Sequence, residues 1–140
     1  VGLDLWKKKI ETGKDFILKI TCNDKKQVST SGGYSINFQT SRNQTDGVIF
    51  HFNPRAPTSA VVLNTLHKTN GWGKEAKIMV ANIQREYFEK PFKLRIHVLK
   101  DDTIHVYVNG NLLTEYLCTD HKITDTAYIV FSPFITIEKC

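Results

Sequence analysis

The sequence predicts an all-β fold, a sandwich of two antiparallel sheets. Apolar residues alternate with polar ones at a period of two, turn-forming residues separate these runs, and no long stretch keeps a helical stripe. In a strand, this alternation sends one set of side chains into a core and the other set to the opposite face. Many short strands joined by frequent turns are typical of a β-sandwich.

The N-terminal half contains the first three predicted strands. They cover residues 16–21, 34–39 and 48–53. In the third strand, the period of two places Val48, Phe50 and Phe52 on the core face. The turn formers Gly32-Gly33 and Asp46-Gly47 separate the three runs, so we expect each run to form its own strand.

The remaining predicted strands lie in the second half of the chain. They cover residues 60–65, 92–98 and 103–108. Asp101-Asp102 lies between the last two runs and is expected to form a hairpin tip, and Asn109-Gly110 is expected to form the next. We expect the sandwich to be filled by the aromatic group Tyr87, Phe88 and Phe92.

Length and composition exclude several function classes. The chain has 140 residues, the size of one domain over 1–140, and its 41% hydrophobic content is too high for a disordered chain. No apolar run approaches the roughly 20 residues of a membrane helix, so we expect no membrane insertion. The net charge of +5 is modest, and the Lys7-Lys8-Lys9 cluster is interpreted as solvated surface. Without a basic helix or zinc-finger spacing, no nucleic-acid partner is predicted.

Cysteine and histidine usage argues against metal and redox chemistry. Three widely spaced cysteines form no disulfide framework and no Cys-x-x-Cys pair: Cys22, Cys118 and Cys140. The five histidines are scattered without the short spacing of metal ligands. We therefore expect no metal and no cofactor, and reduced thiols suit a cytosolic origin.

A row of polar side chains at residues 51–55 is the most informative pattern. Within a strand, His51, Asn53 and Arg55 share one face while the intervening phenylalanine faces the core. An imidazole, a carboxamide and a guanidinium together offer several hydrogen-bond donors and a few acceptors. Such a row suits a ligand that is rich in hydroxyl groups.

Neighbouring segments add the other groups that a sugar site needs. Asn64 shares a face with Val62 in the next predicted strand, and Trp72 follows between two glycines. Glu75 and Lys77 are two residues apart and share a face. A pyranose packs its apolar C–H face on an aromatic ring, and its hydroxyls need paired donors and acceptors, because an unpaired buried polar group costs roughly 1–3 kcal/mol.

These motifs resemble the galectin family. The family pattern is His-x-Asn-Pro-Arg, then Val-x-Asn, then Trp-Gly-x-Glu-x-Arg. This chain has His51-Phe52-Asn53-Pro54-Arg55, then Val62-Leu63-Asn64, then Trp72-Gly73-Lys74-Glu75-Ala76-Lys77. The likeness extends to residues 47–50 and 105–110 and covers nearly the whole chain. It implies a jelly-roll sandwich whose concave sheet binds β-galactosides, of the lactose or N-acetyllactosamine type, without a metal and without catalysis.

The resemblance also implies a role for each site residue. Trp72 would stack on the apolar face of galactose. His51, Asn53 and Arg55 would hydrogen-bond the axial 4-hydroxyl, which separates galactose from glucose. Asn64 would take the 6-hydroxyl.

Glu75 would share the 6-hydroxyl with Asn64 and would reach the second sugar together with Arg55 and Lys77.

Three positions depart from the family pattern or interrupt it. Lys77 replaces the family arginine and loses a planar fork that could bind Glu75 and sugar together, so we expect a weaker grip on the second sugar. The loop at residues 56–59 is short, with Ala56 where phenylalanine is usual. Leu63 should face away from the ligand, into the core. The alternative interpretation of Lys77 is a solvated strand residue paired with Glu75, worth about 0–1 kcal/mol.

Two other function classes compete with this interpretation. A glycosidase generally needs two carboxylates about 5–9.5 Å apart, but the cluster holds only Glu75, which Arg55 and Lys77 would keep ionised. We therefore expect that the protein is not an enzyme. The second alternative is a galectin-fold interaction module with altered or lost lactose binding, acting through protein contacts or a modified glycan.

The resemblance also implies partners and a location. Single galectin sites bind small sugars weakly, so a homodimer or a second linked domain would supply avidity toward glycans and glycoproteins. With no signal peptide visible, we expect cytoplasmic synthesis and export to the extracellular space by a non-classical route.

Overall fold

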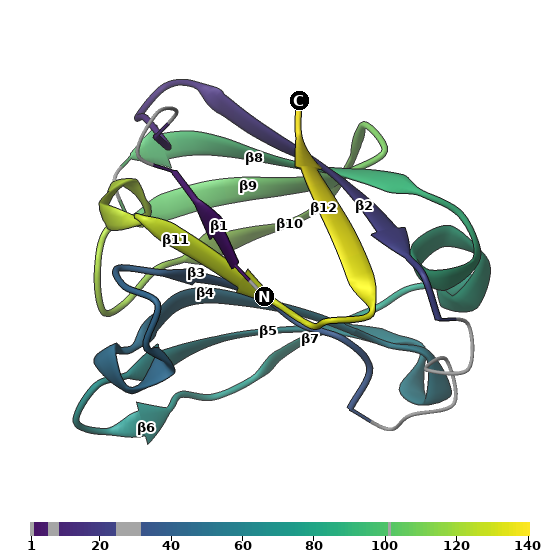
Figure 1. Ribbon diagram of the computed structural model, residues 1–140, viewed down its shortest axis with the longest axis horizontal. Helices are drawn as coiled ribbons and strands as arrows, with labels where there is room; N and C mark the ends of the chain where they lie inside the picture. Colours follow the sequence, from purple (N-terminus) through teal and green to yellow (C-terminus); the bar gives the residue numbers. More distant parts are fainter. Residues whose placement is uncertain (1, 6–8, 25–31, 101) are drawn as a thin grey trace.

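Two antiparallel β-sheets stack as the two layers of the molecule (Figure 1). The computed structural model describes residues 2–5, 9–24, 32–100 and 102–140. The predicted surface cluster at Lys7-Lys8 and the Asp101 half of a predicted hairpin tip lie outside these residues. The all-β sandwich expected from the alternation of the sequence is confirmed.

Seven strands form the larger sheet, and five form the smaller one. In hydrogen-bonded order, the larger sheet contains β1 (Gly2–Asp4), β11 (Tyr128–Phe131), β3 (Ile36–Gln39), β4 (Val48–Arg55), β5 (Ala60–His67) and β6 (Gly71–Trp72), and β7 (Ala76–Met79) also pairs with β5. The smaller sheet contains β10 (Asn111–Leu117), β9 (Thr103–Val108), β8 (Phe92–Lys100), β2 (Asp15–Cys22) and β12 (Ile135–Lys139). Short helical turns join them at η2 (Gln44–Asp46), η3 (Ala56–Thr58), η4 (Gln84–Glu89) and η5 (Ile123–Asp125).

A single apolar cluster fills the space between the two sheets. Alternate residues of β2 and β8 point into it, as the period of two predicts. Leu63 is fully buried there, which confirms the prediction that it faces away from the polar row. The aromatic group predicted to fill the sandwich is buried as well, and the rings of Tyr87 and Phe92 lie 5.0 Å apart between centroids.

The start of β4 differs from the prediction. Ile49 belongs to the apolar cluster between the sheets, whereas Val48 is buried outside that cluster. The reason is a register shift between Val48 and His51 in the pairing of β4 with β5, which breaks the strict alternation. Beyond the shift, His51 lies directly opposite Asn64. The irregularity therefore sets the register on which the polar row depends.

The hairpin tip between β9 and β10 has the predicted form. Asn109 and Gly110 both have positive φ, at 50° and 84°. This is the conformation of a two-residue type I′ turn, whose twist matches the twist of the flanking strands.

Among the described residues, no helix is long and apolar enough to cross a membrane.

Candidate functional site

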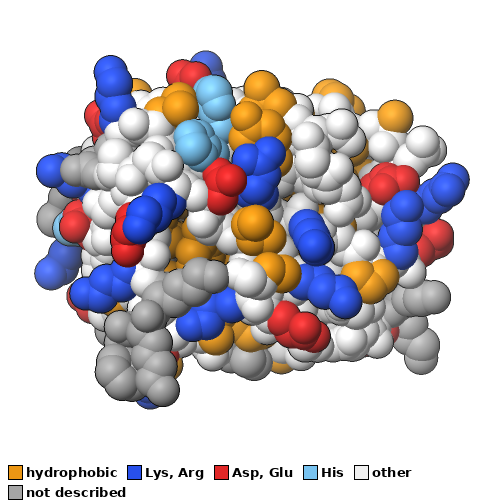
Figure 2. All heavy atoms as spheres, turned by 90° about the horizontal axis from the view of Figure 1, so that it is seen from above, with side chains coloured by type: hydrophobic (Ala, Val, Ile, Leu, Met, Phe, Trp, Pro, Cys, Tyr) orange, Lys and Arg blue, Asp and Glu red, His pale blue; other side chains and the backbone are white. Residues whose placement is uncertain are grey.

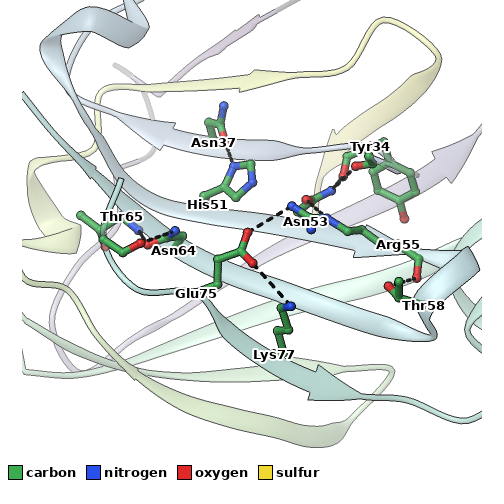
Figure 3. Close-up of polar contacts among 12 residues, drawn as sticks. Tyr34, Asn37, His51, Asn53, Arg55, Thr58, Asn64, Thr65, Glu75 and Lys77 are labelled. Atoms are coloured by element: carbon green, nitrogen blue, oxygen red, sulfur yellow. Dashed lines mark hydrogen bonds and ion pairs between the residues drawn. The ribbon is translucent and has the colours of Figure 1, made fainter. Parts of the chain in front are cut away.

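Strand register gathers the predicted polar residues on the outward face of the seven-stranded sheet. His51 on β4 lies opposite Asn37 on β3 and Asn64 on β5. One row further along, Val62 on β5 lies between Asn53 on β4 and Lys77 on β7. The side chains therefore come from four adjacent strands and the segment after β6, and they point toward one another (Figure 3).

An open hollow of about 330 Å³ lies over these strands. It is lined by His51, Arg55, Asn64, Trp72, Gly73 and Glu75. Five of the seven predicted site residues thus line one hollow. The other two, Asn53 and Lys77, contact lining residues instead of lining it themselves.

Asn53 is buried, and both the nitrogen and the oxygen of its side-chain amide form hydrogen bonds within the protein. Its Nδ2 donates to the backbone carbonyls of Gly32 and Tyr34 at 2.8 and 2.6 Å, and its Oδ1 accepts from Arg55 Nε at 2.8 Å. With only 3% of the residue exposed, its main effect here is to hold the Arg55 guanidinium over the hollow.

A glycine that sequence reasoning did not single out makes this arrangement possible. Gly33 has φ +60, and a Cβ on it would lie 1.8 Å from the Pro54 carbonyl oxygen. Only glycine tolerates both conditions. The close approach brings the Gly32 carbonyl within reach of Asn53. The Gly-Gly pair was the only sequence signal, and it indicated a turn without indicating what the turn contacts.

The Glu75 carboxylate lies between two cations. Arg55 Nη2 donates to Glu75 Oε2 at 3.3 Å, and Lys77 Nζ lies 3.9 Å from Oε1. These groups are partly exposed, so the pairs contribute about 0–1 kcal/mol each to stability. Their effect is therefore mainly to orient the carboxylate as an acceptor. Lys77 reaches it at one atom and does not supply the two parallel bonds of a guanidinium.

Trp72 presents an unusually exposed indole for its type. It is 44% exposed, and its ring centroid lies 4.8 Å from that of His51 at an interplanar angle of 58°. Asn64 anchors this segment, because its Nδ2 donates to the Gly73 carbonyl at 2.9 Å. A large aromatic ring held beside a polar hollow is a platform for an amphipathic ligand.

His51 is held neutral. Burial is the main cause that lowers its pKa to about 4, and the nearby Arg55 guanidinium lowers it further, while Asn53 and Glu75 act in the opposite direction. Its Nδ1 lies 2.5 Å from Asn37 Oδ1. Sequence reasoning missed Asn37: it belongs to the polar set of a predicted strand, but only the register of β3 against β4 shows its partner.

The hollow contains a single carboxylate, Glu75, among its lining residues. Over the described part of the chain, no group of three or more His, Cys, Asp or Glu side chains is arranged to hold a metal ion. Cys22 and Cys118 are buried and Cys140 is exposed, and no disulfide joins any of these cysteines in the described part of the chain. Burial raises the pKa of Cys118 to about 12, so this thiol is a poor nucleophile near neutral pH.

The stacked antiparallel sheets and the polar hollow beside an exposed tryptophan define a β-sandwich protein with a candidate binding face for a polar ligand. A family model described as galactoside-binding lectin matches residues 4–129. The chain therefore belongs to the galactoside-binding lectins, the galectin family, and the jelly-roll expectation is confirmed with it.

Solved structures of galectins share the fold over almost the whole chain. A Caenorhabditis elegans galectin, LEC-6, is 18% identical with a TM-score of 0.72, covering 99% of this chain and 86% of that one. A double variant of human galectin-16 is 21% identical with a TM-score of 0.73, covering 100% and 95%. Sheep galectin-11, in complex with glycerol, is 18% identical with a TM-score of 0.72, covering 100% and 96%. At these identities the likeness concerns the fold.

Proposed function

We propose that this galectin binds β-galactosides of the lactose or N-acetyllactosamine type in the hollow over β4, β5 and β6. The proposal depends chiefly on one observation: the exposed Trp72 ring borders a hollow whose other walls offer an imidazole, an amide, a guanidinium and a carboxylate. A pyranose with one apolar face and several hydroxyls matches that combination.

The contacts suggest how each group would act. Trp72 would stack on the sugar's C–H face. His51 would accept a hydrogen bond from the axial 4-hydroxyl of galactose, and Arg55, already fixed by Asn53, would donate one. An equatorial 4-hydroxyl would leave these polar groups without partners, at a cost of roughly 1–3 kcal/mol per group.

The remaining residues would hold the 6-hydroxyl and the second sugar. In this proposal Asn64 and Glu75 would share the 6-hydroxyl, and Arg55 and Glu75, with Lys77 beside them, would form a charged edge that meets the second sugar. The Lys77 ammonium is a point donor, so its grip on the second sugar would be weaker than that of arginine.

Calorimetric titration with lactose, with cellobiose as the glucose-terminated control, tests the proposal. Saturable heat with lactose and none with cellobiose is the expected result. Equal heats would show that the site does not distinguish an axial from an equatorial 4-hydroxyl. Silence with both sugars would favour the second candidate.

That candidate is an interaction module on the same fold, which acts through protein contacts or a modified glycan. One observation favours it: Lys77 stands at the charged edge, where the family motif has arginine, and reaches Glu75 only at 3.9 Å. Lactose competition separates the two, because lactose displaces a lectin from cells and leaves a protein contact in place.

Cytoplasmic synthesis with non-classical export completes the proposal, together with a homodimer or a second linked domain as the source of avidity. The site needs neither metal nor catalytic group, because recognition of a neutral sugar rests on stacking and hydrogen bonds.

A further inference from the structure

The contact between Asn37 and His51 determines which ring nitrogen carries the proton. Asn37 Oδ1 lies 2.5 Å from His51 Nδ1, across the β3–β4 pair in which the two residues are directly opposite. An amide oxygen can only accept a hydrogen bond, so Nδ1 must donate. In a neutral imidazole with a proton on Nδ1, Nε2 has no hydrogen and is an acceptor.

The other groups around the ring act on its pKa, while the assignment itself rests on the Asn37 contact. Burial is the largest cause of the low pKa of about 4, and a side-chain hydrogen bond with Asn53 acts against it by raising the pKa. The charged groups are Arg55, on the same strand as His51, and Glu75, beyond β6, and their effects are opposed and smaller. The neutral ones are Asn53, whose oxygen already accepts from Arg55 Nε, and Asn64, whose Nδ2 donates to a backbone carbonyl.

Asn37 itself is held in place by its strand. It is 6% exposed and lies between Val130 on β11 and His51 on β4. Figure 3 shows its oxygen on the His51 side and the second nitrogen of His51 on the side away from Asn37. The contact thus occupies one ring nitrogen and leaves the other for the hollow.

We propose that Asn37 is a positioning residue that fixes His51 in the Nδ1–H tautomer and so makes Nε2 an obligatory acceptor for a ligand hydroxyl. The second half of this statement rests on the proposed function. The direction of the hydrogen bond is therefore fixed: the ligand must donate a hydroxyl hydrogen to His51 Nε2. A ligand group that can only accept hydrogen bonds is rejected at this position.

Nitrogen NMR of the ligand-free protein tests the tautomer without any sugar. In uniformly ¹⁵N-labelled protein near neutral pH, we expect the two His51 ring nitrogens to show a protonated Nδ1 and an unprotonated Nε2. Asn37→Ala should shift both resonances toward the average of the two tautomers. A protonated Nε2 in the wild type would overturn the proposal, whether or not the protein binds lactose.

A pH series distinguishes positioning from a merely structural role. Asn37→Asp keeps an acceptor at this place but adds a charge that raises the pKa of His51. At about pH 8 we expect lactose affinity near that of the wild type. Toward about pH 5.5 we expect roughly a tenfold loss in the variant alone, because protonated Nε2 can no longer accept.

The matched control is Asn111→Asp, the same charge change on an exposed residue of the other sheet, which should leave the affinity unchanged at both pH values. If Asn37→Asp and Asn37→Ala lose affinity equally at every pH, Asn37 only supports the fold and the proposal is wrong. If the wild type does not bind lactose at all, the proposed function fails, and the NMR result still decides the tautomer.

Discussion

Histidines lie on the outward faces of both sheets, but the two faces surround them in opposite ways. On the five-stranded sheet, His97 and His105 are directly opposite each other on β8 and β9. His97 Nδ1 lies 2.6 Å from Asp15 Oδ1, and His105 Nε2 lies 3.0 Å from Glu115 Oε2. Figure 2 shows histidine side chains beside acidic and basic ones on the face of the molecule seen from above.

The outward face of the five-stranded sheet carries the same residue types as the hollow. Arg95 lies 3.8 Å above the centroid of the Tyr107 ring and 3.4 Å from Asp15. There the aromatic ring, the guanidinium and the carboxylates are partners of one another. Over β4–β6, by contrast, Trp72 is 44% exposed, and the histidine faces a neutral amide. Whether these side chains can bind a ligand therefore depends more on the neighbours that strand pairing places beside them than on the residue types alone.

The largest expected effect is that of Asn53→Ala. The change leaves two backbone carbonyls and the Arg55 Nε without their partner, so we expect the free energy of unfolding to fall by roughly 2–4 kcal/mol. Urea denaturation measures this change, and lactose binding should fall below detection.

The comparison on the five-stranded sheet is His105→Gln, which removes an exposed contact with Glu115 and should change stability by less than about 1 kcal/mol. Similar losses from both variants would mean that the two faces do not differ as described.

Trp72→Ala should weaken lactose binding by about thirtyfold or more, the effect of losing an aromatic contact worth at least roughly 2 kcal/mol. Because the ring is exposed, the thermal midpoint should scarcely move. Titration calorimetry and a melting curve on the same preparation check both statements. A wild-type affinity in this variant would place the sugar elsewhere.

His51 predicts a pH dependence of stability. Its pKa is lowered in the folded protein to about 4, from about 6.5 in the unfolded chain. Between these values the unfolded state binds more protons, so the free energy of unfolding falls as the pH falls through this window. His51→Gln should remove this part of the dependence. Denaturation curves of both proteins at several pH values give the difference, and identical profiles would contradict the neutral, buried histidine.

Lys77→Arg should have the smallest effect, a gain of about two- to fivefold in lactose affinity, because a guanidinium can bind Glu75 and sugar with two parallel bonds. In the proposed function Lys77 contacts the second sugar only, so the affinity for galactose alone should stay the same. The ratio of the two affinities, measured by calorimetry, is the readout. An equal gain for both sugars would place Lys77 against the first sugar instead of the second.

Local periodicity was sufficient for the fold class. The alternation at a period of two placed Phe50, Phe52 and Leu63 inside, and all three are buried. It failed at Val48 and Ile49, because a register shift between strands is a property of the pair and not of one segment.

By itself, the sequence determined that the chain forms a two-sheet sandwich and that His51, Asn53 and Arg55 share one face, because the period of two is built into every strand. Only the tertiary structure decided what each of them contacts. Asn37 contacts His51 because the register of β3 against β4 places the two residues opposite each other. Gly33 allows its segment to pack against Pro54, so that the Gly32 carbonyl accepts a hydrogen bond from Asn53. Such contacts join residues that are distant along the chain, and strand pairing and loop closure, which no local pattern encodes, bring them together.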